Sequence, residues 1–209
     1  MRKTLQFNKN DKESIYISSI DEKMSKLIER VNECKVVLAD DYYLSLIKSI
    51  IGQQLSLKAA DTIYNRFIEL CEYVTPEKIT SLKDEELRSI GLSRSKIIYM
   101  KDLSNNVINK CIDLNEIDNY EDEEIIKILT KVKGIGKWTA QMFLIFSLGR
   151  LDIFSPQDLG LKKGIKWLYD LNEIPSEKET MHMSEKFSPY RTVLSLYLWE
   201  ASNKGLLGG

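Results

Sequence analysis

Apolar residues recur every three or four positions along most of this chain, the spacing that predicts amphipathic helices. Polar capping residues precede several of these segments: Asp40 or Asp41, then Ser56, then Thr75 followed by Pro76. No segment alternates convincingly between apolar and polar residues, so strands are not expected. The pattern therefore predicts an all-α fold. Its apolar positions with helical spacing are Leu44, Ile47, Ile50 and Ile51; Ala59, Ala60, Ile63 and Phe67; Ile97, Ile98 and Leu103; and Val193, Leu194, Leu196, Tyr197 and Trp199.

The composition is that of an ordinary water-soluble domain. The chain has 209 residues, 43% hydrophobic and 29% charged, enough for one or two domains with a sizeable core. No apolar run approaches the roughly 20 residues of a membrane helix, and the N-terminus lacks the apolar core of a signal peptide. We expect a cytoplasmic protein without membrane contact.

Cysteine and histidine are too few and too scattered for a metal centre. Cys34, Cys71 and Cys111 are widely spaced and contain no CxxC pair, so they predict buried or incidental thiols. His182 is the one histidine and cannot form a cluster. A four-cysteine iron–sulfur ligand set is excluded.

The formal net charge is -1, but charge is unevenly distributed along the chain. Basic residues gather around residues 129–166, where Asp152 and Asp158 are the opposing carboxylates, and an acidic run precedes them. This pattern predicts a locally basic face on a neutral protein, with moderate non-specific affinity for nucleic acid. The basic residues are Lys131, Lys133, Lys137, Arg150, Lys162, Lys163 and Lys166; the acidic run is Asp113, Glu116, Asp118 and Glu121 to Glu124.

Gly134-Ile135-Gly136 lies between a predicted helix that ends near Thr130 and another that starts near Lys137. Gly134 can take positive φ and turn the chain tightly, and Gly136 has no Cβ to keep a phosphate from the backbone. Amide groups at the N-terminus of the following helix suit an anion. The Ile135 side chain would pack into the protein core beneath the hairpin and anchor it. A phosphate-binding hairpin of this kind contacts the DNA backbone and does not distinguish one base from another. The alternative interpretation is a plain helix–helix turn.

Five segments, in one order along the chain, resemble the helix-hairpin-helix DNA glycosylase superfamily, and within it the 3-methyladenine DNA glycosylase II family. The resemblance implies two helical lobes with an interlobe cleft and a Gly/Pro-Asp loop after the hairpin. Residues 42–150 would form the hairpin lobe, and residues 1–41 plus 151–209 the second lobe. An extra N-terminal sheet domain is not expected. The segments are residues 50–56, 91–96, 129–140, 154–161, and 188–191 with Trp199.

Asp158 follows Pro156 and opens an amphipathic helix, so from the residues alone it could be a helix cap. The resemblance places it at the catalytic aspartate of the family. There it would stabilise oxocarbenium character on the sugar or activate the attacking water. The rival carboxylate, Asp152, matches a loop position that we interpret as structural, and Arg191 is expected to pair with an acidic group or carbonyls.

The resemblance also implies how DNA is held. Trp138 and Trp199 would line a base pocket, with Met142 facing the same cleft; core aromatics are the alternative. Gln54 would fill the gap left by a flipped nucleotide, the alternative being a polar helix–helix connection. Arg94 and Lys96 could contact phosphate or remain solvated, and Tyr42 and Tyr43 could reach the cleft or pack at a helix start. The DNA-binding residues are predicted to be Gly134, Ile135, Gly136, Lys137, Thr139, Gln53 and Gln54.

The resemblance finally implies the reaction and its requirements. Bifunctional members carry a nucleophilic lysine where this chain has Trp138, so simple hydrolysis of alkylated purines from duplex DNA is expected. No cofactor is required, although the main-chain carbonyls of Thr130, Val132 and Ile135 could hold a monovalent cation. We expect a monomer, bacterial in type and associated with the nucleoid through DNA. The alternatives are a non-catalytic helix-hairpin-helix DNA-binding protein and a bifunctional oxidised-purine glycosylase.

Overall fold

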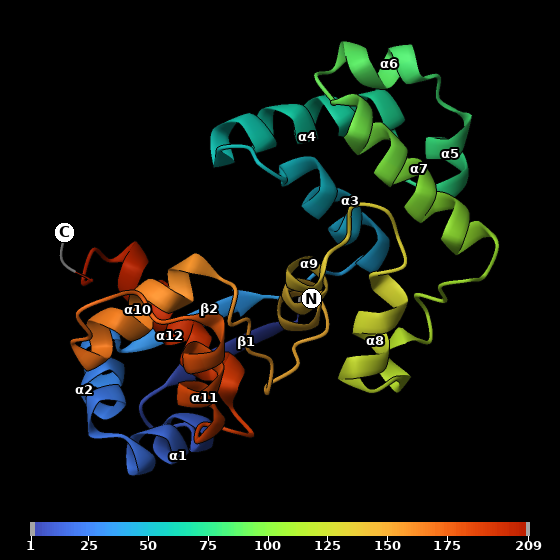
Figure 1. Ribbon diagram of the computed structural model, residues 1–209. Coiled ribbons are helices and arrows are strands. Elements are labelled where there is room, and N and C mark those ends of the chain that lie inside the picture. Colours follow the sequence, from blue (N-terminus) through green and yellow to red (C-terminus); the bar gives the residue numbers. More distant parts are fainter. Residues whose placement is uncertain (1–2, 208–209) are drawn as a thin grey trace. The chain divides into compact units, whose positions relative to one another are not determined.

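The computed structural model describes residues 3–207; residues 1, 2, 208 and 209, at the ends of the predicted second lobe, lie outside the described residues. The described part is predominantly helical, which confirms the predicted fold class (Figure 1). None of its helices has the length and apolar character needed to cross a membrane. The elements are β1 (Thr4–Asn8), α1 (Lys12–Ile20), α2 (Glu22–Val31), β2 (Glu33–Val37), α3 (Tyr42–Gly52), α4 (Leu57–Cys71), α5 (Pro76–Ser81), α6 (Asp84–Ser89), α7 (Arg94–Ile108), the 3-10 turn Ile117–Asn119, α8 (Asp122–Leu129), α9 (Lys137–Phe146), α10 (Leu159–Tyr169), α11 (Glu177–Glu185) and α12 (Arg191–Asn203).

The chain divides into two compact units, which we call the central unit (residues 39–143) and the terminal unit (residues 1–38 and 144–209). The predicted lobe boundaries were residues 42 and 150. The start differs because Asp41 caps α3 and so belongs with it. The end differs because residues 144–150 pack with the terminal unit: Phe146 contacts Trp199, and the Cα of Gly149 lies against Leu38.

The central unit is built around α3 and α7. Asp41 accepts a hydrogen bond from the Leu44 amide at 2.8 Å, as expected of an N-cap, and Ile47, Ile50 and Ile51 of α3 are buried. α7 packs against α3, α5 and α6. The caps predicted at Ser56 and Thr75 are confirmed, because each accepts a bond from the amide three residues on.

Two helices of the central unit are less buried than their patterns predicted. In α4 the predicted core positions Ala59, Ala60 and Ile63 are only half-buried, and Phe67 is buried. On α7, Ile98 is 52% exposed. The pattern identified the apolar side of each helix correctly, but no neighbouring element covers the whole of that side.

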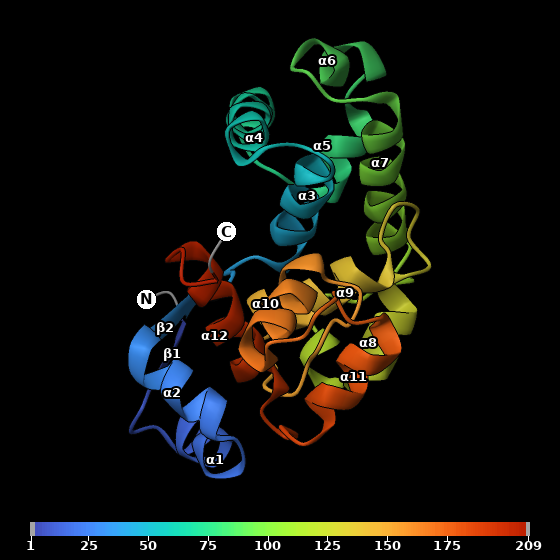
Figure 2. The same cartoon turned by 60° about the vertical axis from the view of Figure 1, so that its left-hand side comes forward.

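The terminal unit contains two short strands that the sequence did not predict (Figure 2). β1 and β2 are antiparallel, with Thr4 opposite Val37 and Asn8 opposite Glu33. Each strand has five residues, and in β2 only Cys34 and Val36 are buried, so the alternation is too short to distinguish from a turn. The core of this unit joins α1, α2, α10 and α12, and its centre is the fully buried Tyr197.

Candidate nucleic-acid interface and carboxylate site

The predicted hairpin is present in the central unit. α8 ends at Leu129, Thr130 is its C-cap, and α9 begins at Lys137. Gly134 has φ +80°, which confirms its predicted positive φ, and the Ile135 side chain is buried, as predicted. A Cβ added at Gly136 would meet no atom within 4 Å, so the backbone there is open to an approaching group. The amides of the first turn of α9 have no acceptor within their own helix and point out of its N-terminus.

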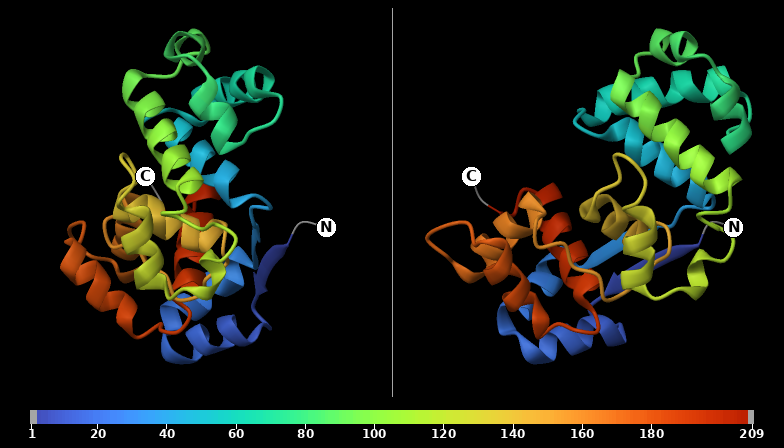
Figure 3. Two further views of the ribbon diagram at one scale, coloured as in Figure 1. Left: turned by 90° about the vertical axis from the view of Figure 1, so that its right-hand side faces the viewer. Right: turned by 45° about the vertical axis from the view of Figure 1, so that its right-hand side comes forward.

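The helix α7 lies beside the hairpin (Figure 3) and contacts it through two side chains. The ring of Tyr99 lies so close to the Cα of Gly134 that a side chain there would overlap it. The Asp102 carboxylate accepts a hydrogen bond from the Lys133 amide at 2.9 Å and lies 3.6 Å from the Lys133 ammonium. Gly134 is thus required for two reasons, its positive φ and its contact with Tyr99.

The predicted DNA contacts differ in exposure. Lys137 is exposed at the start of α9, and Lys131 and Lys133 are exposed beside it, which supports a locally basic face. Thr139 is only 6% exposed, so its side chain faces the protein, and the prediction applies at most to its amide. Ile135 likewise offers only its main chain.

The two glutamines after α3 have different environments. Gln54 is exposed and adopts φ +57°, an uncommon conformation for a residue with a side chain. The Gln53 side chain donates a hydrogen bond from Nε2 to the Gly134 carbonyl at 2.7 Å. Sequence reasoning missed this contact, because Gln53 and Gly134 are 81 residues apart. It uses one donor of the Gln53 side chain, and direct contact of Gln53 with DNA stays a prediction.

In the terminal unit, Asp158 is the N-cap of α10. Its Oδ1 accepts hydrogen bonds from the Leu161 amide at 2.9 Å and from Trp199 Nε1 at 3.2 Å. The Trp199 ring is half-buried and packs against Phe146, with centroids 5.7 Å apart. The cap that the residues alone suggested is therefore real, and the same carboxylate also meets an indole.

Gly160 leaves room beside this pairing, although sequence reasoning did not single it out. A Cβ at Gly160 would lie 3.0 Å from Asp158 Oδ1 and 3.4 Å from the Trp199 ring. The available signal was an Asp-Leu-Gly sequence at a helix start, where glycine is otherwise unfavourable. Gly160 keeps the space between carboxylate and ring free of side-chain atoms.

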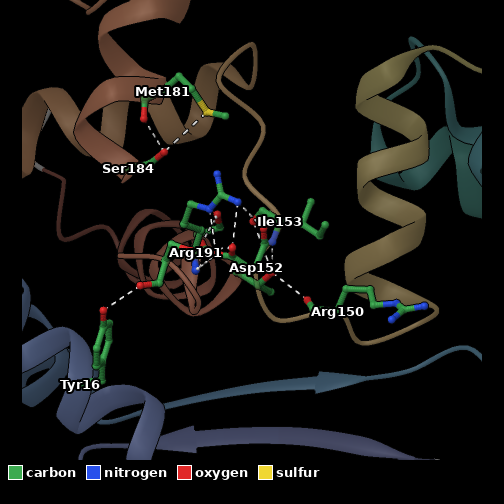
Figure 4. Close-up of polar contacts among 10 residues, drawn as sticks. Tyr16, Arg150, Asp152, Ile153, Met181, Ser184 and Arg191 are labelled. Carbon is green, nitrogen blue, oxygen red and sulfur yellow. Dashed lines mark hydrogen bonds and ion pairs between the residues drawn. The ribbon is translucent and has the colours of Figure 1, made fainter. Parts of the chain in front are cut away.

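Asp152 is structural, as predicted, and Arg191 is its partner (Figure 4). Arg191 donates from Nε and Nη2 to the two carboxylate oxygens at 2.8 and 2.9 Å, and Ser188 Oγ donates to Oδ2 at 2.9 Å. Partial burial disfavours the charged carboxylate, but the hydrogen bonds from Arg191 and Ser188 outweigh it and hold the pKa of Asp152 below its ordinary value. This carboxylate anchors the loop that leads to Asp158.

Trp138 and Met142 lie on α9 in the central unit. Trp138 is 42% exposed, so the core alternative is wrong for this residue, and Met142 is half-buried. A pocket that would unite them with Trp199 stays a prediction.

Other polar candidates have partners within the central unit. Lys96 Nζ donates to the Ile51 carbonyl at 2.8 Å, whereas Arg94 is exposed. Tyr42 bonds Asp118 at 2.8 Å, and Tyr43 is buried and bonds Ser104 at 2.7 Å. The buried Tyr43 therefore follows the helix-packing alternative, whereas a role of the half-buried Tyr42 at the cleft stays a prediction.

The three free cysteines differ in burial, and Cys111 is the exposed one among them. Cys34 and Cys71 are buried, and burial raises the pKa of the Cys34 thiol to about 12, which makes it unreactive at neutral pH. Residues 3–207 contain no group of three or more His, Cys, Asp or Glu able to hold a metal ion. The hairpin offers main-chain oxygens instead: the Val132 carbonyl already accepts a bond from the Ile135 amide at 3.1 Å and retains a second lone pair.

A helical protein with a two-glycine hairpin between α8 and α9, and with a capped carboxylate against an indole, has the features of the helix-hairpin-helix class. Residues 47–189 match the family described as HhH-GPD superfamily base excision DNA repair protein. DNA-3-methyladenine glycosylase 1 of Schizosaccharomyces pombe is 35% identical over 198 residues, covering 91% of this chain and 87% of the relative. The chain therefore belongs to the HhH-GPD superfamily, and the predicted resemblance is confirmed.

Solved structures agree with this assignment. The crystal structure of a DNA-3-methyladenine glycosidase from Bacillus halodurans has TM-score 0.89 and 37% identity, covering 97% of this chain and 94% of that one. The 3-methyladenine DNA glycosylase of Schizosaccharomyces pombe in complex with abasic DNA has TM-score 0.85 and 34% identity, covering 92% and 97%.

Proposed function

We propose that this protein is a monofunctional DNA glycosylase that hydrolyses the N-glycosidic bond of alkylated purines, of the 3-methyladenine type, in duplex DNA. The observation that carries the proposal is the Asp158–Trp199 pair at the N-terminus of α10, joined at 3.2 Å and kept accessible by Gly160. A protein that only held DNA through the hairpin would not need this pair. The names of the relatives support the same substrate class.

The chemistry requires one carboxylate and no acid. An alkylated purine such as 7-methylguanine is positively charged, so when the bond to C1′ breaks, the electron pair leaves with the base and neutralises it. Water then supplies hydroxide to C1′ and a proton to solvent, which balances the reaction. Asp158 would stabilise the positive sugar electrostatically, or accept the proton of the attacking water. The electron-rich Trp199 face would attract the cationic base.

The base must leave the duplex to reach a carboxylate. In the proposed complex the backbone around Gly136 and Lys137 holds a phosphate, Gln54 occupies the gap, and Trp138 and Met142 contribute to the base pocket. Trp138 stands where bifunctional relatives carry a lysine nucleophile, so no covalent enzyme–DNA intermediate forms.

A lesion panel of duplex oligonucleotides, scored for base release, tests the proposal. Asp158→Asn keeps a side chain that caps helices well but removes the negative charge, so base release should fall at least about 100-fold, with DNA affinity retained. Asp170→Asn is the matched control, since Asp170 is an exposed residue at the other end of α10. A wild type that releases no alkylated purine would overturn the function, and a fully active Asp158→Asn would overturn the role of Asp158.

Borohydride reduction separates the two enzyme classes. A monofunctional enzyme gives no trapped protein–DNA adduct, whereas a bifunctional glycosylase forms a reducible imine and would give one. An adduct would contradict the role assigned to the Trp138 position.

We also propose that the carbonyls of Thr130, Val132 and Ile135 hold a monovalent cation, because main-chain oxygens are suitable ligands for a hard cation. DNA binding should then weaken when potassium chloride is replaced by tetramethylammonium chloride at constant ionic strength. Unchanged affinity would exclude a functional ion at the hairpin.

A further inference from the structure

The turn between α3 and α4 holds an exposed residue in a conformation that it would not adopt unaided. Gln54 has φ +57°, and two long main-chain hydrogen bonds flank it, from the Gln53 amide to the Ile50 carbonyl at 3.4 Å and from the Leu55 amide to the Gly52 carbonyl at 3.2 Å. A non-glycine residue in this region costs about 1 kcal/mol or more and persists where surrounding contacts enforce it. Contacts with more distant parts of the central unit are made by its neighbours Gln53 and Ile51.

Two side chains make hydrogen bonds at this turn and at the end of α3 beside it. Gln53 Nε2 donates to the Gly134 carbonyl at 2.7 Å, and Lys96 Nζ donates to the Ile51 carbonyl at 2.8 Å. Partial burial disfavours the charged ammonium and lowers the pKa of Lys96, in agreement with a side chain that packs partly against the protein. A cavity of about 350 Å³ lies between the two contacts, lined by Gln53, Gln54, Lys96, Tyr99 and Gly134 among others.

The same helix, α7, holds the hairpin. Lys96 contacts the end of α3, Tyr99 covers Gly134, and Asp102 accepts a hydrogen bond from the Lys133 amide. These three residues lie at intervals of three along α7, so they share one side of the helix. The turn and the hairpin are therefore fastened to one rigid element and, through Gln53, to each other.

We propose that Gln53 and Lys96 are positioning residues: they hold the Gln54 turn against the hairpin, so that phosphate capture by the hairpin sets where Gln54 enters the DNA. This inference rests on the proposed function and gives Gln53 a role besides its predicted contact with DNA. A rigid link matters because flipping a paired base costs a few kcal/mol, and a loosely held Gln54 would compensate less of that cost. Where the lesion is already unpaired, the link should matter little.

The test compares Gln53→Met and Lys96→Met, which keep side-chain length but remove the donor, with Gln6→Met on the exposed face of β1 as the matched control. Single-turnover release of 7-methylguanine is measured with the lesion opposite cytosine and opposite an abasic site. In an Asp158→Asn background, which blocks the chemistry, a 2-aminopurine beside the paired lesion reports unstacking at saturating protein. Thermal melting of each variant reports folding.

Both variants should release the paired lesion about 10-fold more slowly and the unpaired lesion within about twofold of wild type, and should lower the fluorescence change by half or more. Equal slowing on both substrates, or no slowing on either, would overturn the inference while leaving the proposed function intact. If wild type releases no base, the proposed function fails, but the 2-aminopurine fluorescence still tests the inference. A fluorescence change in the Gln53→Met and Lys96→Met variants as large as in their parent would overturn the positioning role of these residues.

Discussion

The two candidate sites of this protein are built from different parts of the polypeptide. In the central unit, the hairpin presents main chain: Gly134 turns the backbone and Gly136 leaves it open. In the terminal unit, the site is made of side chains, with the Asp158 carboxylate bonded to the Trp199 indole. A main-chain site is damaged by adding atoms, whereas a side-chain site is damaged by removing a functional group.

The supports of the two sites differ accordingly. The hairpin is positioned by buried Ile135 and by the Tyr99 ring, so its shape depends on packing. The carboxylate is positioned by the cap of α10 and by a loop anchored through Asp152 and Arg191, so its orientation depends on hydrogen bonds. Substitutions that add atoms at the hairpin, or remove a functional group near Asp158, therefore test this difference between the two sites.

The largest effect is expected at Gly134. Gly134→Ala would place a Cβ in the Tyr99 ring at a positive φ, so we expect about 3 kcal/mol or more of lost stability and at least about 100-fold weaker DNA binding. Chemical denaturation and DNA titration measure the two losses.

Gly136→Ala is the matched control for that substitution. No atom lies within 4 Å of the new Cβ, so stability should stay within about 0.5 kcal/mol while DNA binding weakens about 10-fold, because the methyl group obstructs a phosphate. If Gly136→Ala binds DNA as wild type does, the phosphate does not approach at Gly136.

Arg191→Met removes the partner of Asp152 and should cost about 2–3 kcal/mol of stability at pH 7. Because the pKa of Asp152 is lowered in the folded protein, its contribution is present above the unfolded value of about 4 and is lost as pH falls through the folded value. The stability difference between wild type and variant should therefore narrow below about pH 4. Urea denaturation across pH 3–7 measures this, and a difference that does not narrow would show that Asp152 contributes little through its charge.

Local signals accounted for much of the fold. The caps at Asp41, Ser56 and Thr75 were predictable because an N-cap bonds an amide only three residues away. The hairpin was predictable for the same reason, since two glycines between helices define it. Burial was harder to predict: Ile98 has core spacing but is exposed, because periodicity identifies an apolar side without identifying what covers it.

The contacts that sequence reasoning missed join distant segments. Asp152 was recognised as structural and Arg191 as paired, but their mutual pairing spans 39 residues. The hydrogen bond from Gln53 to the Gly134 carbonyl was not predicted, because nothing local indicated it. Such pairings depend on packing, which one sequence does not disclose.

Trp199→Phe sharpens the comparison at the carboxylate. The variant keeps an aromatic ring but loses the N–H that donates to Asp158 Oδ1, and one hydrogen bond to a charged group is worth about 1.5–3 kcal/mol. The rate of base release should fall about 10-fold or more, with DNA affinity within twofold of wild type. A variant whose affinity falls while its rate is unchanged would assign Trp199 to binding rather than to orientation of the carboxylate.

The smallest effect is expected at Lys137. It is the charged side chain among the hairpin residues that are predicted to bind DNA. Lys137 is exposed at the first position of α9, where Lys137→Gln should leave the fold unchanged. If Lys137 neutralises one phosphate, the slope of log affinity against log salt should fall by about 1, and affinity at low salt should fall a few-fold. Exposed Lys178 on α11 provides the matched control, Lys178→Gln. An unchanged slope for Lys137→Gln would mean that the hairpin binds phosphate through its main chain alone, which would make the contrast with the side-chain site of Asp158 complete.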